Sequence, residues 1–304
     1  MKILITGANG FIGKKLVGSL RNKHQLVCQY RKENFEVNEY DSFFFDICRK
    51  SSWSNALQNV SAVIHLAAVA HNKFNDTVSM HETNVKGTVN LARQAAESGV
   101  KRFIFLSSIG VNGISNSSPF LVYDSPAPVE NYAISKFEAE IGLLKIAAET
   151  GMEVVIIRPP LVYGPNAPGN FGKLANLARK NLPLPFGAIY NKRSLVSIDN
   201  LVDLIVTCID HPKAANQTFL VSDDHDVSTT ELLREMTLAS GKKPRLLPVP
   251  MGWLNLAAKL TGKRAVIDRM CGSLQVDISH TKEVLGWEPP VSFKDGIQKC
   301  FSKE

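Results

Sequence analysis

Short apolar runs alternate with longer amphipathic stretches through the first half of the chain. The apolar runs predict buried β-strands at Lys2–Thr6, Gln25–Tyr30, Phe43–Asp46, Ala62–Ala67, Arg102–Ser107 and Glu153–Arg158. The amphipathic stretches predict helices at Phe11–Arg21, Thr77–Ser98 and Asn131–Thr150. Strands that alternate with helices form βαβ units, so the pattern predicts an α/β fold. Its core is a Rossmann-type, doubly wound parallel sheet with helices on both faces.

The pattern becomes irregular after Arg158, where loops lengthen and prolines and glycines cluster. A helix at Asn200–Ile209 and a strand at Gln217–Val221 are expected to return to the first domain. Shorter helices are expected at Ser228–Ser240, Gly252–Leu260 and His280–Leu285. These elements divide the chain into a dinucleotide-binding domain, residues 1–164 completed by about 199–222, and a smaller α/β lobe, residues 165–198 and 223–304. Ligands bind beyond the carboxyl ends of the strands in such folds, so the lobe is expected to cap the site.

The composition is that of a globular protein with a mildly basic surface. The 304 residues are 44% hydrophobic and 21% charged, with a net charge of +7. No run of Lys and Arg is longer than two residues, which favours a solvated surface or an anionic small substrate over nucleic acid. No apolar stretch reaches the roughly 18 residues that a membrane span needs. The first residues lead directly into a strand, without the charged and apolar segments of a signal peptide, so a cytoplasmic protein is expected.

The cysteines give no sign of a disulfide framework or a metal site. There are five, they lie far apart, and no two have the C-x-x-C spacing. Free thiols in a reducing compartment are therefore expected, with no bound metal.

A glycine-rich loop follows the first strand and precedes the first helix. Its glycines are spaced Gly7-x-x-Gly10-x-x-Gly13. Glycines in this context permit a tight turn and let backbone N–H groups approach a pyrophosphate at the helix N-terminus. The motif predicts a dinucleotide site that includes Gly7, Asn9, Gly10, Phe11, Ile12 and Gly13.

A serine, a tyrosine and a lysine follow in the order that acid–base chemistry would use. Ser107 and Ser108 end the fifth apolar run, and Tyr132 and Lys136 lie one turn apart on one helix face. A nearby ammonium favours the phenolate and is expected to lower the pKa of Tyr132. The pattern predicts that Ser108, Tyr132 and Lys136 are catalytic, with Tyr132 exchanging a proton with a substrate hydroxyl.

These motifs, in this order, resemble those of extended short-chain dehydrogenases/reductases of the nucleotide-sugar kind. Further matching segments are Asp46-Ile47, His65-Leu66-Ala67-Ala68, Asn84-x-x-Gly87-Thr88, Arg158-Pro-Pro-x-x-Tyr163-Gly164-Pro165 and Leu285-Gly286-Trp287-Glu288-Pro289. The resemblance covers essentially the whole chain. It implies cofactor contacts from Asp46 and Ile47 at the adenine, and also from Leu66, Ala67, Ala68, Asn84, Lys136 and Pro159. Lys136 would bind the nicotinamide ribose, and Ser108 would bond the reacting sugar oxygen.

Cofactor choice is usually set at the end of the second strand. The chain has Gln29-Tyr30-Arg31-Lys32 there, with no carboxylate before Glu33. A carboxylate would favour NAD, whereas the guanidinium of Arg31 can bind a 2′-phosphate with two hydrogen bonds. A surface arginine stacked on the adenine is the alternative. The cofactor is therefore NAD or NADP, with NADP(H) slightly favoured.

Substrate contacts are expected in the second lobe. By resemblance, Asn170 would meet the nucleotide of a UDP-sugar, and Arg193 and Arg269 would bind its pyrophosphate. Cys271–Asp277 departs from the common epimerase pattern, and its role stays open. Ala70 stands where sugar 4-epimerases often carry a lysine, and the role of the following His71 also stays open.

Three functions fit these residues. The first is a 4-ketoreductase acting at C4 of a UDP-linked 4-keto sugar in polysaccharide precursor synthesis, as the resemblance to enzymes that form UDP-N-acetylquinovosamine implies. The second is a 4-epimerase of UDP-hexoses or UDP-N-acetylhexosamines, and the third a non-catalytic redox sensor. The retained tyrosine and lysine disfavour the sensor, and Ile109-Gly110 after the serine disfavours a 4,6-dehydratase. The resemblance also implies a homodimer through Thr77–Ser98 and Asn131–Thr150.

Overall fold

A parallel sheet forms the base of the molecule in the computed structural model, which describes residues 1–31, 40–70, 77–262 and 264–302. Within these residues the sheet has seven strands in the order β3-β2-β1-β4-β5-β6-β9. They are β1 (Lys2–Thr6), β2 (Gln25–Tyr30), β3 (Asp41–Phe44), β4 (Ala62–His65), β5 (Arg102–Leu106), β6 (Glu153–Arg158) and β9 (Thr218–Leu220). Each neighbouring pair is parallel. The strand order reverses between β1 and β4, which opens a crevice at their carboxyl ends and confirms the predicted Rossmann-type fold.

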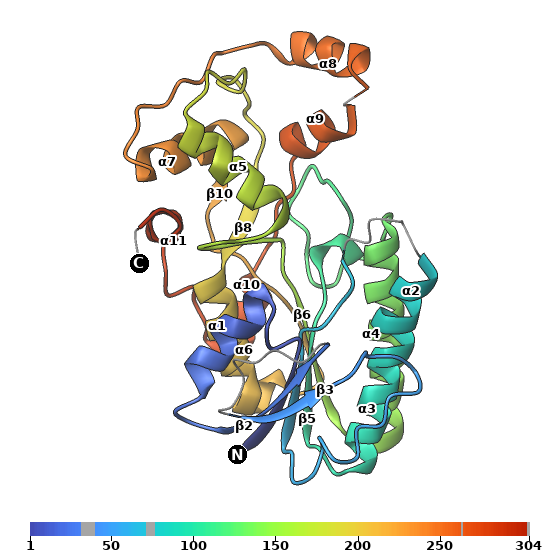
Figure 1. Cartoon of the computed structure of the whole chain (residues 1–304). Helices are drawn as coiled ribbons and strands as arrows, with labels where there is room; N and C mark the ends of the chain where they lie inside the picture. Colours follow the sequence, from blue (N-terminus) through green and yellow to red (C-terminus); the bar gives the residue numbers. More distant parts are fainter. Residues whose placement is uncertain (32–39, 71–76, 263, 303–304) are drawn as a thin grey trace.

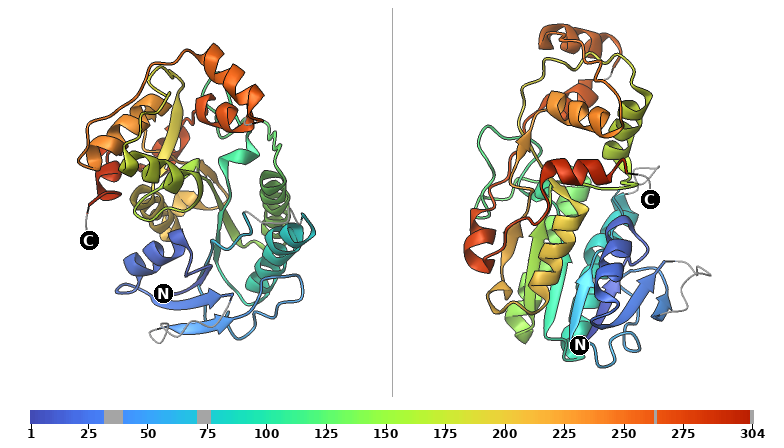
Figure 2. Two further views of the ribbon diagram at one scale, coloured as in Figure 1. Left: turned by 45° about the horizontal axis from the view of Figure 1, so that its top comes forward. Right: turned by 90° about the vertical axis from the view of Figure 1, so that its left-hand side faces the viewer.

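Helices cover both faces of this sheet, as Figures 1 and 2 show. α1 (Phe11–Leu20) and α6 (Ile198–Asp210) pack against each other and share one apolar core with the sheet. α3 (Thr88–Glu97) and α4 (Asn131–Thr150) enclose a second core on the other face. Except for the edge strand β3, the strands are largely buried on both faces, which explains their nearly continuous apolar sequences.

The predicted helix Thr77–Ser98 is divided into three segments. α2 (Thr77–His81) leads into a π-helical stretch, η1 (Glu82–Gly87), and then into α3. A Cβ atom on Gly87 would lie only 2.7 Å from Cγ2 of Ile47, so the helix approaches the loop after β3 closely there. π-helical insertions of this kind are frequent at functional sites.

The second lobe is built on a small sheet with the order β10-β8-β7. Its strands are β7 (Leu161–Tyr163), β8 (Arg193–Ser197) and β10 (Asp226–Val227). The predicted helices appear as α7 (Thr229–Ala239), α8 (Met251–Leu260) and α10 (Ser279–Leu285). The pattern missed α5 (Gly169–Lys180), α9 (Arg264–Cys271), α11 (Phe293–Lys299) and the 3₁₀ turns η2 (Ile109–Val111) and η3 (Pro212–Ala214).

Strand pairing bears on the proposed division into two domains. β9, which lies within residues 199–222, pairs with β6 in the large sheet. β7 lies before residue 164 but pairs with β8 of the small sheet. Among the helices that the structure describes, none is both long and apolar enough to cross a membrane.

Candidate active site

The glycine-rich loop has a shape that only glycine allows. Gly7 adopts a left-handed backbone with φ of +67°. A Cβ atom on Gly13 would lie 2.3 Å from the carbonyl oxygen of Gly7, so the loop and α1 could not pack as they do. Gly10 caps α1 without a side chain, which leaves the first N–H groups of the helix available to an anion.

A cleft of about 450 Å³ opens beside this loop, at the strand ends where the sheet order reverses. Its lining includes residues predicted to bind the cofactor: Gly7, Asn9, Gly10, Arg31, Asp46, Ile47, Leu66, Ala67 and Ala68. It also includes residues that were not predicted to bind the cofactor: Gln29, Phe45, Val69, Ala70 and Thr83. The loop geometry and the cleft together fit a dinucleotide, whose pyrophosphate would lie at the start of α1. His71 and Glu33, which the sequence analysis mentioned, lie outside the described residues.

Gln29 ties the glycine-rich loop to the edge of the sheet. Its buried amide donates to the carbonyls of Tyr30, at 2.9 Å, and Phe45, at 2.7 Å. Its Oε1 accepts the N–H of Gly7 at 3.4 Å. A glutamine at the end of β2, where a ribose-binding carboxylate is common, was the signal that could have identified it.

Arg31 forms an ion pair in this cleft with Asp46, with Nε 3.1 Å from Oδ1. Both side chains are largely exposed, so the pair is weak. The guanidinium that would have to bind a 2′-phosphate nevertheless already has the Asp46 carboxylate beside it. The pairing therefore weakens the argument for NADP that the sequence supplied.

Ser108 lies at the start of the 3₁₀ turn η2, which packs against the first turn of α4, where Tyr132 stands. The Oγ of Ser108 accepts the N–H of Gly110 at 3.1 Å and caps that turn. A Cβ atom on Gly110 would lie 3.3 Å from this Oγ and 3.1 Å from Cβ of Ala133, the residue after Tyr132. The N–H of Ile109 donates to the carbonyl of Pro159 at 2.9 Å, which holds the end of β6 against the same turn.

The electrostatics of Tyr132 and Lys136 differ from the expectation. Burial raises the pKa of Tyr132 to about 12. Burial also lowers the pKa of Lys136 to about 7, although Glu140 acts against it. The ammonium donates to the carbonyl of Leu106 at 2.8 Å and lies 5.8 Å from the centre of the Tyr132 ring. The predicted lowering of the Tyr132 pKa is therefore wrong, because desolvation of the phenol raises it.

A buried ion pair lies one turn beyond Lys136. Glu140 accepts from Nη2 of Arg158 at 2.5 Å and from Nε at 3.0 Å. The hydroxyl of Ser107 also donates to Glu140, at 2.5 Å, and Arg158 donates to Asn112 at 3.0 Å. This network joins the end of β5, α4 and β6 next to the candidate catalytic residues. The spacing of these residues along the chain gave no sign of it.

Asn84 ties α4 to the loop after β4. Its Nδ2 donates to the carbonyl of Val69 at 3.0 Å and to Oγ of Ser135 at 3.0 Å. Its Oδ1 accepts the N–H of Val69 at 2.8 Å, and Ser135 donates in turn to the carbonyl of Tyr132. Both amide hydrogens have acceptors inside the protein, so Asn84 positions the cleft and Tyr132 and does not offer a free donor to a cofactor.

The second lobe brings two predicted substrate arginines together. Nη1 of Arg193, at the start of β8, donates to the carbonyls of Arg269, at 2.6 Å, and Gly272, at 3.1 Å. Burial lowers the pKa of Arg193. Arg269 reaches Glu130, with Nη2 2.5 Å from Oε1, and Glu130 is the N-cap of α4. Asn170 is exposed in the first turn of α5.

The Cys271–Asp277 segment has a structural part in this lobe. The N–H of Leu274 donates to the carbonyl of Lys192, just before β8, at 2.9 Å, and its carbonyl accepts the N–H of Ser194 at 2.9 Å. The N–H of Phe120 donates to the carbonyl of Gln275 at 2.9 Å. The segment thus joins the small sheet to the loop that follows β5.

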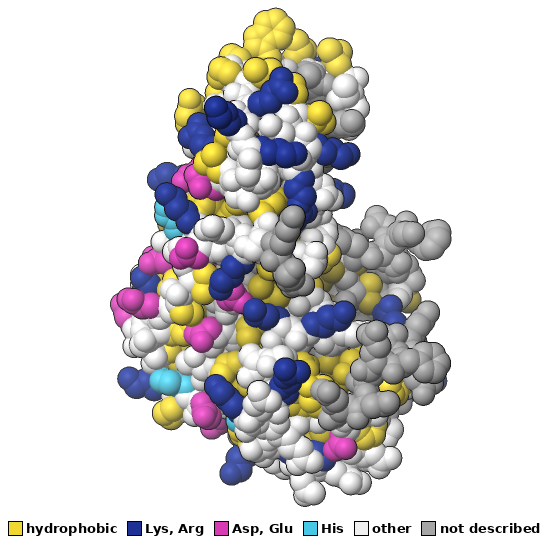
Figure 3. Space-filling view, turned by 60° about the vertical axis from the view of Figure 1, so that its left-hand side comes forward, with side chains coloured by type: hydrophobic (Ala, Val, Ile, Leu, Met, Phe, Trp, Pro, Cys, Tyr) yellow, Lys and Arg dark blue, Asp and Glu magenta, His cyan; other side chains and the backbone are white. Residues whose placement is uncertain are grey.

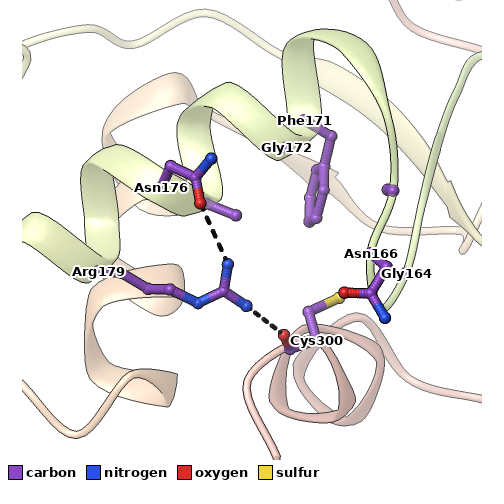
Figure 4. Close-up of a pocket in the computed structure, with 9 residues that line it drawn as sticks. Gly164, Asn166, Phe171, Gly172, Asn176, Arg179 and Cys300 are labelled. Atoms are coloured by element: carbon purple, nitrogen blue, oxygen red, sulfur yellow. Dashed lines mark hydrogen bonds between the residues drawn. The ribbon is translucent and has the colours of Figure 1, made fainter.

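A separate cavity of about 210 Å³ lies between α5 and the end of α11 (Figure 4). The guanidinium of Arg179 lines this cavity and donates to Oδ1 of Asn176 at 3.4 Å and to the carbonyl of Cys300 at 3.0 Å. None of the residues lining this cavity lines the cleft beside the glycine-rich loop, so we do not assign it to the candidate active site.

The family model described as "NAD dependent epimerase/dehydratase family" matches residues 3–222. A Vibrio cholerae protein described as UDP-glucose 4-epimerase is 51% identical over 98% of this chain and 93% of its own length. An Escherichia coli O157:H7 protein described as N-acetyl-alpha-D-glucosaminyl-diphospho-ditrans,octacis-undecaprenol 4-epimerase is 25% identical over 99% of this chain and 95% of its own length.

Solved structures share the fold along the whole chain. A UDP-glucose 4-epimerase from Thermotoga maritima, solved with UDP-glucose, has a TM-score of 0.80 and 24% identity, and the match covers 99% of this chain and 97% of that one. A UDP-glucuronic acid 4-epimerase from Bacillus cereus, solved with NAD, has a TM-score of 0.81 and 22% identity, with the same coverage.

Proposed function

The chain belongs to the NAD dependent epimerase/dehydratase family, and on that premise we propose that it is a UDP-hexose or UDP-N-acetylhexosamine 4-epimerase. The chain is an NAD-dependent nucleotide-sugar enzyme of the extended short-chain dehydrogenase/reductase kind. The observation that carries the narrower proposal is the 51% identity to a UDP-glucose 4-epimerase along nearly the whole length of both chains.

This proposal reverses the order in which the sequence ranked its two enzymatic functions. The residues favour the 4-ketoreductase partly because a reductase must exchange its dinucleotide at every turnover. Arg31 and the missing carboxylate after β2 favour such an exchangeable NADPH. Both relatives are described as 4-epimerases, which favours that reaction. The ion pair of Arg31 with Asp46 weakens the argument for NADPH. We therefore propose NAD, held through the catalytic cycle, as the cofactor.

Each candidate residue has a chemical task in this proposal. NAD, when bound, supplies a hydride acceptor and donor at C4 of the sugar. Tyr132 would take the proton of the C4 hydroxyl and later return it, and Ser108 would hydrogen-bond the same oxygen. Lys136 would bind the nicotinamide ribose and stabilise negative charge on Tyr132. Arg193 and Arg269 would hold the pyrophosphate of UDP.

Turnover without added cofactor tests the proposal. The purified protein should interconvert UDP-glucose and UDP-galactose, or the matching N-acetyl pair, with no NADH or NADPH added, since the hydride returns to the same carbon. Products would be resolved by chromatography. A protein that converts neither pair, but oxidises one NAD(P)H for each 4-keto sugar consumed, would reinstate the ketoreductase.

A second substrate class follows from one relative. The Escherichia coli protein is described as acting on an N-acetylglucosaminyl diphosphate joined to a polyprenol, so a lipid-linked diphosphosugar is the second candidate. Assaying a polyprenyl-diphosphate sugar beside the UDP-sugars separates the two.

We also propose a homodimer and a cytoplasmic location. Exposed apolar side chains lie on the two predicted contact helices: Val78 on α2 and Ile134, Ile141 and Leu144 on α4. All five cysteines are free, which fits a reducing compartment. Light scattering of an Ile141→Glu variant tests the dimer, because a buried interfacial carboxylate should dissociate it.

A further inference from the structure

The far end of the second lobe exposes an apolar helix face. On α8, Trp253 is 68% exposed, Leu256 51% and Leu260 80%. Their spacings of three and four residues place all three side chains on one side of the helix. Leu254, only 6% exposed, points to the opposite side. α8 therefore packs through one face and presents a second apolar face to solvent.

Neighbouring segments extend this face. Leu247 and Leu182 are 52% and 51% exposed. The two lie on adjacent segments, because Leu184 accepts the N–H of Leu247 at 2.8 Å and donates to the carbonyl of Arg245 at 3.0 Å. We call the set Leu182, Leu247, Trp253, Leu256 and Leu260 the apolar tip. Figure 1 places α8 at the end of the molecule farthest from the large sheet, and Figure 3 shows hydrophobic side chains gathered at that end.

The net positive charge of the chain is concentrated in the same lobe. Residues 165–198 and 236–267 contain eleven Lys and Arg and no Asp or Glu. The remaining chain has 35 − 11 = 24 basic and 28 acidic residues, a balance of −4. The basic residues are scattered along the sequence, as expected, but the acidic ones are missing from these two segments.

Several of these cations lie next to the apolar tip. Lys242, Lys243 and Arg245 are exposed just before Leu247, and Lys259 is exposed on α8 beside the apolar face. Figure 3 shows Lys and Arg side chains below the hydrophobic end. The pyrophosphate of a substrate would use Arg193 and Arg269 and does not account for these more distant cations.

From this combination we infer that the apolar tip docks the enzyme peripherally on an anionic lipid bilayer. Interfacial helices have an apolar face carrying Trp and Leu, flanked by Lys and Arg that meet acidic headgroups. A nucleic acid would use the cations but leave the apolar face exposed to water. Docking through this end would leave the dinucleotide cleft, in the other domain, open to solution.

Vesicle binding tests the inference. The full-length protein should cosediment with vesicles of phosphatidylcholine and phosphatidylglycerol, and not with phosphatidylcholine alone. Binding should weaken with added salt, because the Debye length falls to about 3 Å at 1 M. Absence of binding to the anionic vesicles, or equal binding to the neutral ones, would overturn the inference.

Matched variants test whether the cations beside the apolar tip form the membrane-binding surface. Lys242→Gln, Lys243→Gln and Arg245→Gln together should weaken binding roughly 100-fold, since each cation near a membrane surface contributes about fivefold. The control carries three exposed lysines of the first domain changed in the same way: Lys23, Lys101 and Lys213. It should bind like the wild type, and an equal loss in both triple variants would show general charge attraction without a docking surface.

A separate double variant tests how much the apolar side chains contribute to vesicle binding. Trp253→Ser with Leu260→Ser should reduce vesicle binding but leave turnover of a soluble UDP-sugar unchanged, because neither residue is placed in the site. Unchanged vesicle binding would refute insertion of the tip. Since vesicle binding is measured without substrate, its failure would not affect the proposed function.

Discussion

His65, at the end of β4, is a buried neutral histidine that should make the protein sensitive to acid. Its Nε2 lies 2.8 Å from Oγ1 of Thr88, which donates its own hydrogen to the carbonyl of Asn84. Nε2 must therefore carry the hydrogen, and Nδ1 accepts from Oγ1 of Thr6 at 2.7 Å. The Thr6 oxygen in turn accepts the N–H of Ala67 at 3.3 Å. These hydrogen bonds fit the neutral ring with its hydrogen on Nε2, and a proton on Nδ1 would break the bond that Thr6 donates to it.

Burial, assisted by the charge of Lys136, lowers the pKa of His65 from 6.5 to about 3. The unfolded chain therefore binds this proton between pH 6.5 and about 3 while the native protein does not, and stability falls as the pH falls through that window. The slope for one such group is about 1.4 kcal/mol per pH unit. Between about pH 7.5 and about pH 5, His65 alone should cost about 2 kcal/mol.

His65→Gln removes the titrating group and keeps one donor and one acceptor. Urea unfolding followed by circular dichroism, with NAD saturating, would be compared for the variant and the wild type across this pH range. The stability difference between them should shrink by about 2 kcal/mol on acidification, since the variant lacks the His65 contribution. His225→Gln, which changes a half-exposed histidine, should follow the wild type. A constant difference between the wild type and His65→Gln would refute the assignment of a neutral His65.

Three further predictions concern the site. Tyr132→Phe should keep NAD binding but reduce turnover by about 10²–10⁴-fold, and near-normal turnover would remove Tyr132 from proton transfer. Arg193→Ala should weaken UDP binding by about 1.5–3 kcal/mol in calorimetry, whereas Arg234→Ala on α7 should not; equal affinities would defeat the pyrophosphate assignment. Glu140→Ala should lower the free energy of unfolding by about 3–5 kcal/mol, because the buried Arg158 would lose its partner, and a change below about 1 kcal/mol would show that solvent replaces the carboxylate.

The glycine-rich loop and the sheet were predictable because their signals are local. Gly7 and Gly13 are required by backbone conformation and close packing within one strand–loop–helix unit. The large strands are buried on both faces, so each appears in the sequence as a continuous apolar run. The small-lobe helix α5 gave no comparable signal, because it begins at Gly169, directly after Pro168, in a stretch rich in such residues.

The electrostatics of the site depended on tertiary structure. The sequence places Tyr132 and Lys136 one turn apart, and from that spacing alone a lowered tyrosine pKa follows. Only the fold shows that burial raises the Tyr132 pKa and lowers that of Lys136, because desolvation depends on which distant segments cover a residue. Likewise, Arg31 is a free cation in the sequence, and the ion pair with Asp46 exists because β2 and β3 are neighbours.

The sequence by itself determined the fold class, the family and the order of the chemical groups, since these are set by residue spacing along one chain. The tertiary structure decided which groups meet: Glu140 with Arg158, and Arg193 with Arg269. Each of these contacts joins segments that are separated in the chain. Their energies depend on distance and burial, and neither quantity is defined until the chain has folded.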